Sequence, residues 1–187
     1  KKVGVTATSH KVIRNLLDEV IAQAAASCQS VKVGQKPADL SDQPGPIVEF
    51  DDNRAAFDAI TRGEVNVLGG TAFMWAREEF AQTLDVLVVD EAGQVSLANA
   101  LAVSPAADTL VLLGDPQQLD QPEKASHPDG VGVSALEHVL GANGTMPSDR
   151  GIFLPVTWRM SPTLTRFTSA LFYEGKLTSK AGLEKQV

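Results

Sequence analysis

The sequence predicts an α/β fold, with a largely parallel sheet and helices on both faces. Short runs of branched apolar residues alternate along the chain with amphipathic segments of helical periodicity, the order that strand–helix–strand connections produce. Two of these runs, at residues 84–89 and 109–113, are rich in Val and Leu, which is typical of strands buried on both faces. The length of 187 residues, with 43% hydrophobic residues, suits one globular domain and the start of a second.

The first half of the chain alternates short strands with two helices. The longer helix is predicted from apolar residues that recur every three or four positions. In order, we expect a strand at 3–7, a helix from Ser9 to about Cys28, a short strand near 31–33, a loop at 34–46, a short strand at 47–50, and a helix at 51–63 with an Asp N-cap and a terminating Gly63.

The second half continues the alternation without internal repeats or low-complexity segments. We expect a strand at 65–70, a short helix from Ala72 to about Phe80, a strand at 84–89, a short helix at 95–103, a strand at 108–113, a loop at 120–132, a helix near 134–140, a loop at 142–151 and a last strand at 151–156.

Composition narrows the class of protein. No apolar run approaches the roughly 20 residues that cross a bilayer, so we expect no membrane function. The single cysteine, Cys28, excludes an internal disulfide and a zinc cluster; it suits a reducing cytoplasm, and we expect it to be a small buried residue. The net charge of -7 disfavours a nucleic-acid coat, yet allows a motor that grips a strand through backbone amides.

Carboxylates and glutamines follow both apolar strands, at the edge where parallel α/β sheets bind ligands. Asp90 and Glu91 end one strand, and Asp115 with Gln118 follows the other. Mg²⁺ prefers oxygen ligands, a second carboxylate can deprotonate a water, and a glutamine can hydrogen-bond a terminal phosphate. Two alternatives stay open: the carboxylates begin an acidic helix N-terminus, and Gln118, like Gln117, is a solvated turn residue.

These strings resemble the motifs of superfamily 1 helicases. LVVDEAGQ resembles motif II (Walker B), LVLLGDPQQL motif III, and residues 153–177 the motif IV region. VGVTATSHKVIRNLL resembles motif Ia, and VLGGTA the nucleic-acid motif that follows it. The DEAGQ spelling, with RM and FYEGKL, resembles the 5′-to-3′ branch, which contains the Upf-type RNA helicases and the nuclease-helicases of replication. The resemblance implies a RecA-like fold.

The chain departs from the family pattern in its phosphate-binding loop. No G-x-x-x-x-G-K-[ST] occurs, and nothing resembles motifs V and VI. With no initiator Met before Lys1, we expect a fragment that lacks the P-loop strand and is itself inactive. We expect residues 1–150 to form part of a first motor domain, and residues 151–187 to hold its last strand and the start of the second.

The resemblance also implies a role for each matching residue. Asp90 would organise Mg²⁺, Glu91 would be the catalytic base, and Gln118 would sense the γ-phosphate of ATP, with Asp115 also at the nucleotide. Arg159 would reach the γ-phosphate from the far side of the cleft. Taken alone, Arg159 is also an exposed arginine before a helix that begins near Pro162.

Hydroxyl side chains at strand ends suggest nucleic-acid contacts. Thr6, Thr8 and Ser9 lie where a strand gives way to a helix, and Thr71 follows two glycines. Hydroxyls and helix N-terminal amides hold phosphates without a basic surface, although Ser9 also suits a helix cap.

Together these features predict an ATP-dependent helicase or translocase on single-stranded DNA or RNA, similar to bacterial proteins in which such a motor follows a RecB-like nuclease. A remodelling ATPase without unwinding activity and a non-catalytic scaffold are the alternatives. The strand at 109–113 is expected to pair with residues 153–156 or with a second copy of the chain, because a buried strand edge needs partners.

Overall fold

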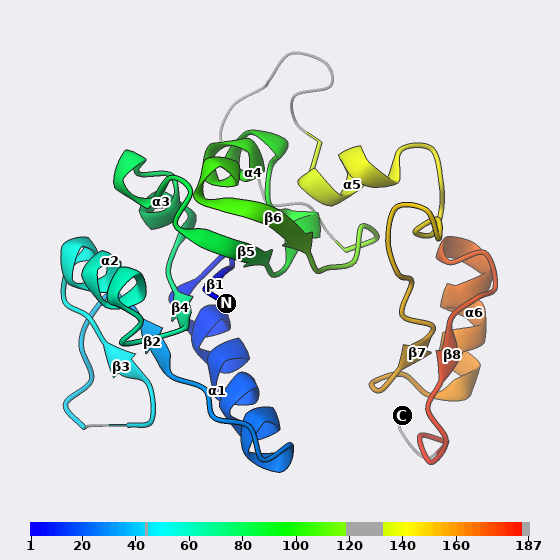
Figure 1. Cartoon of the computed structure of the whole chain (residues 1–187). Helices are drawn as coiled ribbons and strands as arrows, with labels where there is room; N and C mark the ends of the chain where they lie inside the picture. The colour runs from blue at the N-terminus through cyan, green and yellow to red at the C-terminus, as the bar shows by residue number, and fades with distance from the viewer. Residues whose placement is uncertain (44, 119–132, 185–187) are drawn as a thin grey trace. The chain divides into compact units, whose positions relative to one another are not determined.

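A computed structural model describes residues 1–43, 45–118 and 133–184 (Figure 1). The chain divides into two compact units, Lys1–Leu136 and Glu137–Val187. The predicted loop at 120–132 lies outside the described residues. The first unit holds the predicted sheet and the second a smaller strand–helix–strand arrangement, so each is described by itself.

The first unit is built on a six-stranded sheet in the order β3-β2-β4-β1-β5-β6. Every neighbouring pair of these strands is parallel, which confirms the predicted α/β fold class. The strands are β1 (Val3–Thr6), β2 (Val33–Gln35), β3 (Val48–Glu49), β4 (Val67–Gly69), β5 (Leu84–Val89) and β6 (Ala107–Leu112).

Helices and single 3-10 turns connect these strands. Ser9 caps the first helix through its hydroxyl, as predicted, and Asp52 caps the second through a 2.7 Å bond from the Ala55 amide. Gly63 ends the second helix at φ 73°, a conformation in which a Cβ is costly. The elements are α1 (His10–Ala26), α2 (Asn53–Arg62), α3 (Ala72–Trp75), η1 (Glu78–Phe80), η2 (Ala92–Gln94), α4 (Leu97–Val103) and η3 (Ser104–Ala106). A further helix, α5 (Ala135–Leu140), includes the residues at which the chain divides into its two units.

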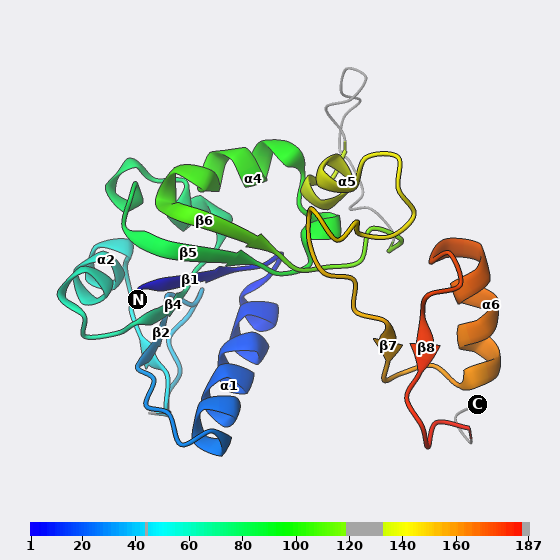
Figure 2. The ribbon, with the colours of Figure 1, turned by 45° about the vertical axis from the view of Figure 1, so that its right-hand side comes forward.

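Helices cover both faces of the sheet. A Cβ at Gly69 would lie 2.6 Å from Ile13 of α1, and Gly69 is the register partner of Val5. In β1, Gly4 comes directly before Val5, so its Cα faces the opposite side of the sheet, because successive residues of a strand alternate. A Cβ at Gly4 would lie 3.2 Å from Trp75 of α3. Figure 2 shows α1 on one side of the sheet and α4 on the other.

Trp75 anchors the face opposite α1. Its side chain is 1% exposed and packs edge-to-face on Phe80, with ring centroids 5.2 Å apart. Its Nε1 donates to the carbonyls of Val5 and Gly70, at 3.2 and 3.1 Å, so the buried indole N–H is satisfied. Trp75 therefore stabilises the fold by apolar burial while fixing the carboxyl ends of β1 and β4.

Three expectations for the first unit are wrong. Gly34 and Gln35 belong to β2 instead of a loop; Gln35 is 1% exposed and donates to the His10 carbonyl, a polar contact that apolar periodicity could not reveal. The helix expected from Ala72 to Phe80 breaks into α3 and η1. Cys28 is exposed, because it follows the end of α1 in a left-handed conformation with φ 53°.

The second unit contains α6 (Pro162–Phe172) beside two short parallel strands, β7 (Val156–Thr157) and β8 (Thr178–Ser179). The strand expected at 151–156 is wrong except at Val156. Pro155 has no N–H to donate to a ladder, although its carbonyl accepts from the Thr178 amide at 2.7 Å. The expected pairing of residues 153–156 with β6 is also wrong: Val156 pairs with Thr178, and in the described part of the chain β6 pairs with β5 alone.

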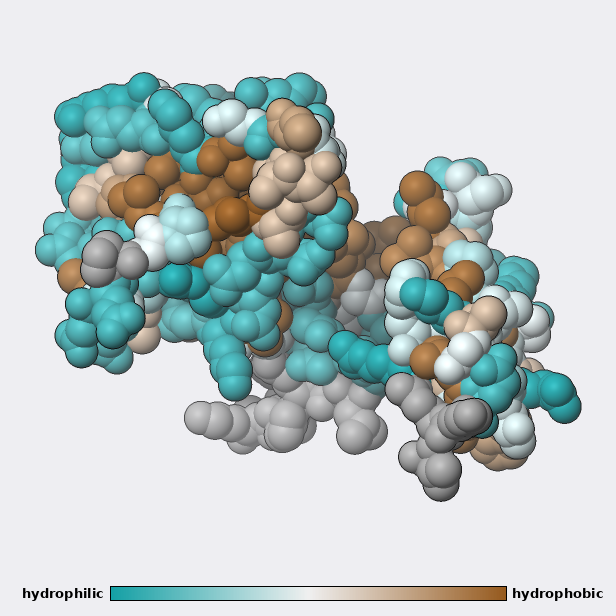
Figure 3. Space-filling view, turned by 90° about the horizontal axis from the view of Figure 1, so that it is seen from below, coloured by the Kyte–Doolittle hydropathy of each residue, from teal (hydrophilic) through white to brown (hydrophobic). Residues whose placement is uncertain are grey.

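Apolar side chains reach the surface of both units (Figure 3). In the second unit they include Ile152, Leu154, Trp158 and Phe167, each at least 64% exposed. Among the described residues, no helix is long and apolar enough to cross a membrane.

Candidate active site

The candidate site lies at the carboxyl edge of the parallel sheet in the first unit. Strands β1, β4, β5 and β6 run in the same direction, so the segments that follow them emerge at this edge. The strand ends and these segments contain every predicted site residue of the first unit: Thr6, Thr8, Ser9, Thr71, Asp90, Glu91, Asp115 and Gln118.

Asp90 and Glu91 form a tight turn directly after β5. The Asp90 amide donates to the Thr6 carbonyl at 2.8 Å, which ties the start of this turn to the end of β1. The Asp90 carboxylate accepts the Glu91 amide through Oδ1 at 3.0 Å. Both side chains are partly buried. The two hydrogen bonds hold the backbone that carries them at the edge of the sheet.

Glu91 has an unusual backbone conformation, with φ 55° and ψ 39°. This left-handed region costs a residue with a Cβ about 1–2 kcal/mol. Hydrogen bonds on either side maintain it: the Glu91 carbonyl accepts from the Gln94 amide at 2.8 Å, and the Ala92 amide donates to the Leu113 carbonyl at 2.7 Å. Strain held by surrounding bonds is typical of functional turns.

Two glycines let the segments after β5 and β6 approach each other closely. A Cβ at Gly93 would lie 2.4 Å from the Asp115 carbonyl oxygen, and one at Gly114 would lie 2.8 Å from the Ala92 nitrogen. Both neighbours are backbone atoms that cannot move aside as a flexible side chain could. The Asp90–Gln94 turn is therefore docked on the Gly114–Gln118 loop.

The glutamines after β6 occupy different positions. The Gln117 amide donates to the Asp115 Oδ1 at 3.0 Å, which makes Asp115 and Gln117 parts of an Asx turn. Gln118 follows that turn and is exposed, and its Oε1 accepts from Nε2 of Gln94 at 3.4 Å. This contact joins the two loops through side chains as well as backbone.

The donor set at this edge fits Mg²⁺ bound to a nucleotide. Carboxylate oxygens are hard ligands of the kind that Mg²⁺ takes. No group of three or more His, Cys, Asp or Glu side chains gathers anywhere in the described ranges. In nucleotide enzymes, Mg²⁺ is usually bound by one or two protein carboxylates, and phosphate oxygens and waters complete its coordination; a site made only of protein ligands is not usual.

The hydroxyl residues at the same edge differ in exposure. Thr6 is 3% exposed, and its Oγ1 has no hydrogen-bond partner among the described residues. Thr8 and Ser9 are exposed, and the Ser9 hydroxyl accepts from the Val12 amide at 3.2 Å, so its capping role is confirmed. Thr71 precedes α3 and makes no side-chain cap bond.

Arg159 belongs to the second unit, whereas the other predicted site residues belong to the first. Its amide donates to the Thr157 hydroxyl at 3.3 Å, and its side chain is exposed just before the N-cap Ser161 of α6. The ammonium of Lys180 lies over the ring of the neighbouring Trp158, 3.2 Å from the ring centroid, in a cation–π contact.

Gln94 is the site residue that sequence reasoning missed. It is the last residue of the DEAGQ string, but its contact with Gln118 joins residues 24 positions apart. The sequence feature that could have indicated this contact is a pair of glycines, Gly93 after β5 and Gly114 after β6. Glycines that mark a close backbone approach predict that neighbouring side chains of the two loops can meet.

Comparisons with known proteins show which proteins the chain is similar to. The family described as the viral superfamily 1 RNA helicase core domain matches residues 11–142. The chain is 26% identical over 189 residues to "Probable helicase MAGATAMA 3" of Arabidopsis thaliana, covering 99% of this chain and 21% of that protein. It is 32% identical over 103 residues to "ATP-dependent helicase NAM7" of Saccharomyces cerevisiae, covering 54% of this chain and 10% of that protein.

The chain thus spans about a fifth of one relative and a tenth of the other. The family match covers more than half of the chain, including β5, β6 and the site residues that follow them. On this match the chain belongs to the superfamily 1 helicase core-domain family.

Proposed function

We propose that this chain is part of an ATP-dependent helicase that couples ATP hydrolysis to movement along single-stranded DNA or RNA. The observation that carries the proposal is the docking of the Asp90–Gln94 turn on the Gly114–Gln118 loop. The docking gathers two carboxylates and an amide at one sheet edge. The printed descriptions of both relatives as helicases support it.

Each side chain of the docked loops has a distinct task in this proposal. Asp90 would hold Mg²⁺, which when bound neutralises phosphate charge. Glu91 orients the attacking water and takes its proton, because a partly buried carboxylate on a rigid turn is a suitable base. Gln118 donates a hydrogen bond to the terminal phosphate, and Asp115 shapes the loop that presents it.

Arg159 contributes from the second motor domain in this proposal. A guanidinium is permanently charged and planar, so it stabilises negative charge on a transferring phosphoryl group. Its exposed position before α6 leaves the side chain able to reach a ligand. We assign residues 1–150 to the first motor domain and residues 151–187 to the start of the second, since the strand expected at 151–156 does not join the sheet of the first unit.

The hydroxyls at the carboxyl edge are proposed contacts for the nucleic-acid backbone. Thr8, Ser9 and Thr71 lie at or near the N-termini of α1 and α3, where helix amides favour phosphate oxygens. Thr6 is a proposed contact as well, because its buried hydroxyl has no partner among the described residues and could bond a phosphate oxygen. DEAGQ, RM and FYEGKL support 5′-to-3′ polarity, and a fused RecB-like nuclease is a further expectation of the same resemblance.

The 187-residue chain by itself should not turn over ATP. It contains no G-x-x-x-x-G-K-[ST], so it lacks the amides and lysine that offset phosphate charge. Without them, the carboxylates at the edge repel a nucleotide. Calorimetric titration with ATP and Mg²⁺ checks this; micromolar affinity with release of phosphate would contradict it.

The test of the function uses Glu91→Gln in the full-length natural protein. The variant should bind ATP with nearly unchanged affinity while turnover stimulated by single-stranded nucleic acid falls by orders of magnitude, because the base is lost and the shape is kept. Turnover at the wild-type rate would contradict the assignment. Stimulated hydrolysis without strand displacement by the wild type would favour a remodelling ATPase.

A further inference from the structure

We infer that Gln94 is a positioning residue that sets which end of the Gln118 amide faces the nucleotide. The inference rests on the proposed function, since it concerns the same site. Gln94 lies at the end of η2, where its amide donates to the Glu91 carbonyl at 2.8 Å. The Val95 carbonyl accepts from the Ala135 amide at 2.8 Å, so the backbone on both sides of Gln94 is held.

The Gln94 side chain spans from the first loop to the second. It is partly buried, whereas Gln118 is exposed and would otherwise be free to rotate. The Nε2 of Gln94 donates to Oε1 of Gln118 at 3.4 Å. The Gln118 backbone is anchored separately, since its amide donates to the Asp115 carbonyl at 3.3 Å. The side-chain contact therefore restricts the amide of a residue whose backbone is already placed.

The chemistry of an amide makes its orientation matter. A glutamine carries an acceptor oxygen at one end and a donor NH₂ at the other, whereas a phosphate oxygen only accepts. Gln118 can therefore bind a terminal phosphate only through Nε2. A donor placed on its Oε1 selects that orientation, and the reverse orientation would turn the Gln118 oxygen toward the phosphate, where two acceptors repel.

A double-mutant cycle tests this inference in the full-length natural protein. Gln94→Met keeps the length of the side chain and removes the donor, and the loss of one hydrogen bond is expected to lower kcat roughly fivefold. The KM for ATP should change by less than about twofold, because the contact matters most once charge develops on the phosphate. In a Gln118→Ala background, Gln94→Met should have no further effect on kcat.

A second variant and a matched control separate orientation from packing. Gln94→Glu presents only acceptor atoms, so it should pull the Gln118 NH₂ away from the phosphate and lower kcat further than Gln94→Met. Gln117→Met, in the neighbouring Asx turn, should leave kcat unchanged. Urea unfolding of the 187-residue chain should give the same midpoint for Gln94→Met and wild type, because the substitution removes one exposed hydrogen bond and keeps the length of the side chain.

Each result decides a different claim. An equal loss from Gln94→Met in the wild-type and Gln118→Ala backgrounds would overturn the inference, as would a wild-type kcat for Gln94→Met. Either outcome leaves the proposed function intact, provided that Glu91→Gln still abolishes turnover. If Glu91→Gln keeps turnover, the proposed function fails instead.

Discussion

Glu91 is a residue whose backbone strain coincides with its proposed role. At φ 55° it occupies a region where glycine carries no steric cost. Glu91→Gly should therefore raise the free energy of unfolding of the 187-residue chain by about 1 kcal/mol, while it removes the proposed base. Urea unfolding of the isolated chain measures the first effect, and ATP turnover of the full-length protein measures the second.

Gln82 provides a matched control for the backbone part of this prediction. It has the same φ of 55° and an exposed side chain, and it precedes the start of β5. Gln82→Gly should give a similar gain in stability with no change in turnover. A Glu91→Gly variant less stable than wild type would show that the Glu91 side chain stabilises the turn more than the left-handed conformation costs.

The sequence predicts which residues lie at the site, but it does not predict their backbone conformations or side-chain contacts. Parallel strands bring their carboxyl ends to one edge, so Asp90 and Gln118 could be placed together from the strand pattern alone. The strained φ of Glu91 and the contact of Gln94 depend on how two loops pack. No periodicity in the chain encodes that packing.

The site is held rigid by the contact between the Asp90–Gln94 turn and the Gly114–Gln118 loop. In Gly93→Ala the added Cβ would lie 2.4 Å from the Asp115 carbonyl oxygen, so one loop must shift. We expect a destabilisation of about 1–3 kcal/mol, as for overpacking elsewhere. Turnover of the full-length protein should fall as well, because Gln118 moves with its loop. Denaturant unfolding and steady-state turnover check the two effects.

Gly45→Ala is the matched control for this substitution. A Cβ at Gly45 would meet only Arg14 Nη2, at an ordinary distance of 3.6 Å. Its effect on the free energy of unfolding should stay within about 0.5 kcal/mol. A neutral Gly93→Ala would mean that the loops approach less closely than the structure shows.

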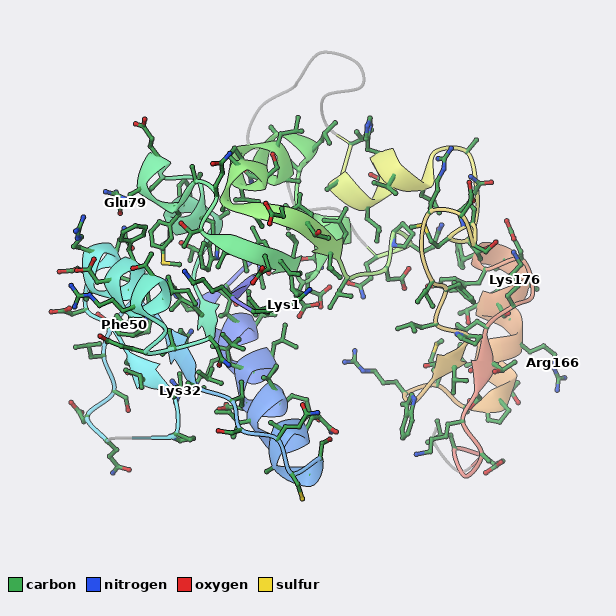
Figure 4. All side chains as sticks on the ribbon, in the orientation of Figure 1. Lys1, Lys32, Phe50, Glu79, Arg166 and Lys176 are labelled. Carbon is green, nitrogen blue, oxygen red and sulfur yellow. The ribbon has the colours of Figure 1, made fainter. Side chains whose placement is uncertain are left out.

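In the second unit, Glu174 clamps the turn after α6 to the loop at residues 143–145. Its carboxylate accepts from the Thr145 hydroxyl, from the Gly144 amide at 3.2 Å, and from the ammonium of Lys176. Figure 4 labels Lys176 in this unit. The Lys176 hydrogen bond, then that of Thr145, lowers the Glu174 pKa below its ordinary 4.5. A lowered folded-state pKa stabilises the fold above pH 4.5, and the stabilisation is lost as the pH falls through the folded value.

The Gly144 amide reports this protonation directly. In an NMR titration of the 187-residue chain, its chemical shift should change with a midpoint below pH 4.5, because the acceptor loses its charge there. Glu174→Gln should abolish this transition and leave the shifts of residues in the first unit unchanged. A midpoint at or above pH 4.5 would show that the clamp does not hold the carboxylate in its charged form.

The strand predictions show where element-level reasoning reached its limit. β5 and β6 were correctly predicted as strands from their runs of Val and Leu, which are typical of burial on both faces. The expected burial is wrong for β6: β5 holds buried residues, whereas no residue of β6 is buried, because β6 lies at the edge of the described sheet. The strand expected at 151–156 failed, since Pro155 cannot donate and the pairing partner, Thr178, lies in a segment with no strand signal. Apolar content alone does not specify which segment pairs with which.

For the whole chain, the free edge of β6 determines how copies should behave in solution. In the described part of the chain β6 pairs only with β5, and Val111 and Leu113 beside the other edge are 37% and 40% exposed. An unpaired edge flanked by apolar side chains is a template for a further strand. Because Val156 pairs with Thr178, a second copy is the remaining partner of the two that the sequence suggested.

We therefore expect the 187-residue chain to form a dimer through β6 as its concentration rises. Light scattering after size exclusion should show the mass increase with concentration. Val111→Lys should keep the chain monomeric, because a charge on an edge strand opposes pairing. Val48→Lys removes an apolar side chain that is 53% exposed on β3, at the opposite edge of the sheet, and should leave the dimer intact. A chain that stays monomeric at every concentration, or a dimer that survives Val111→Lys, would show that the free edge of β6 is not the site of association.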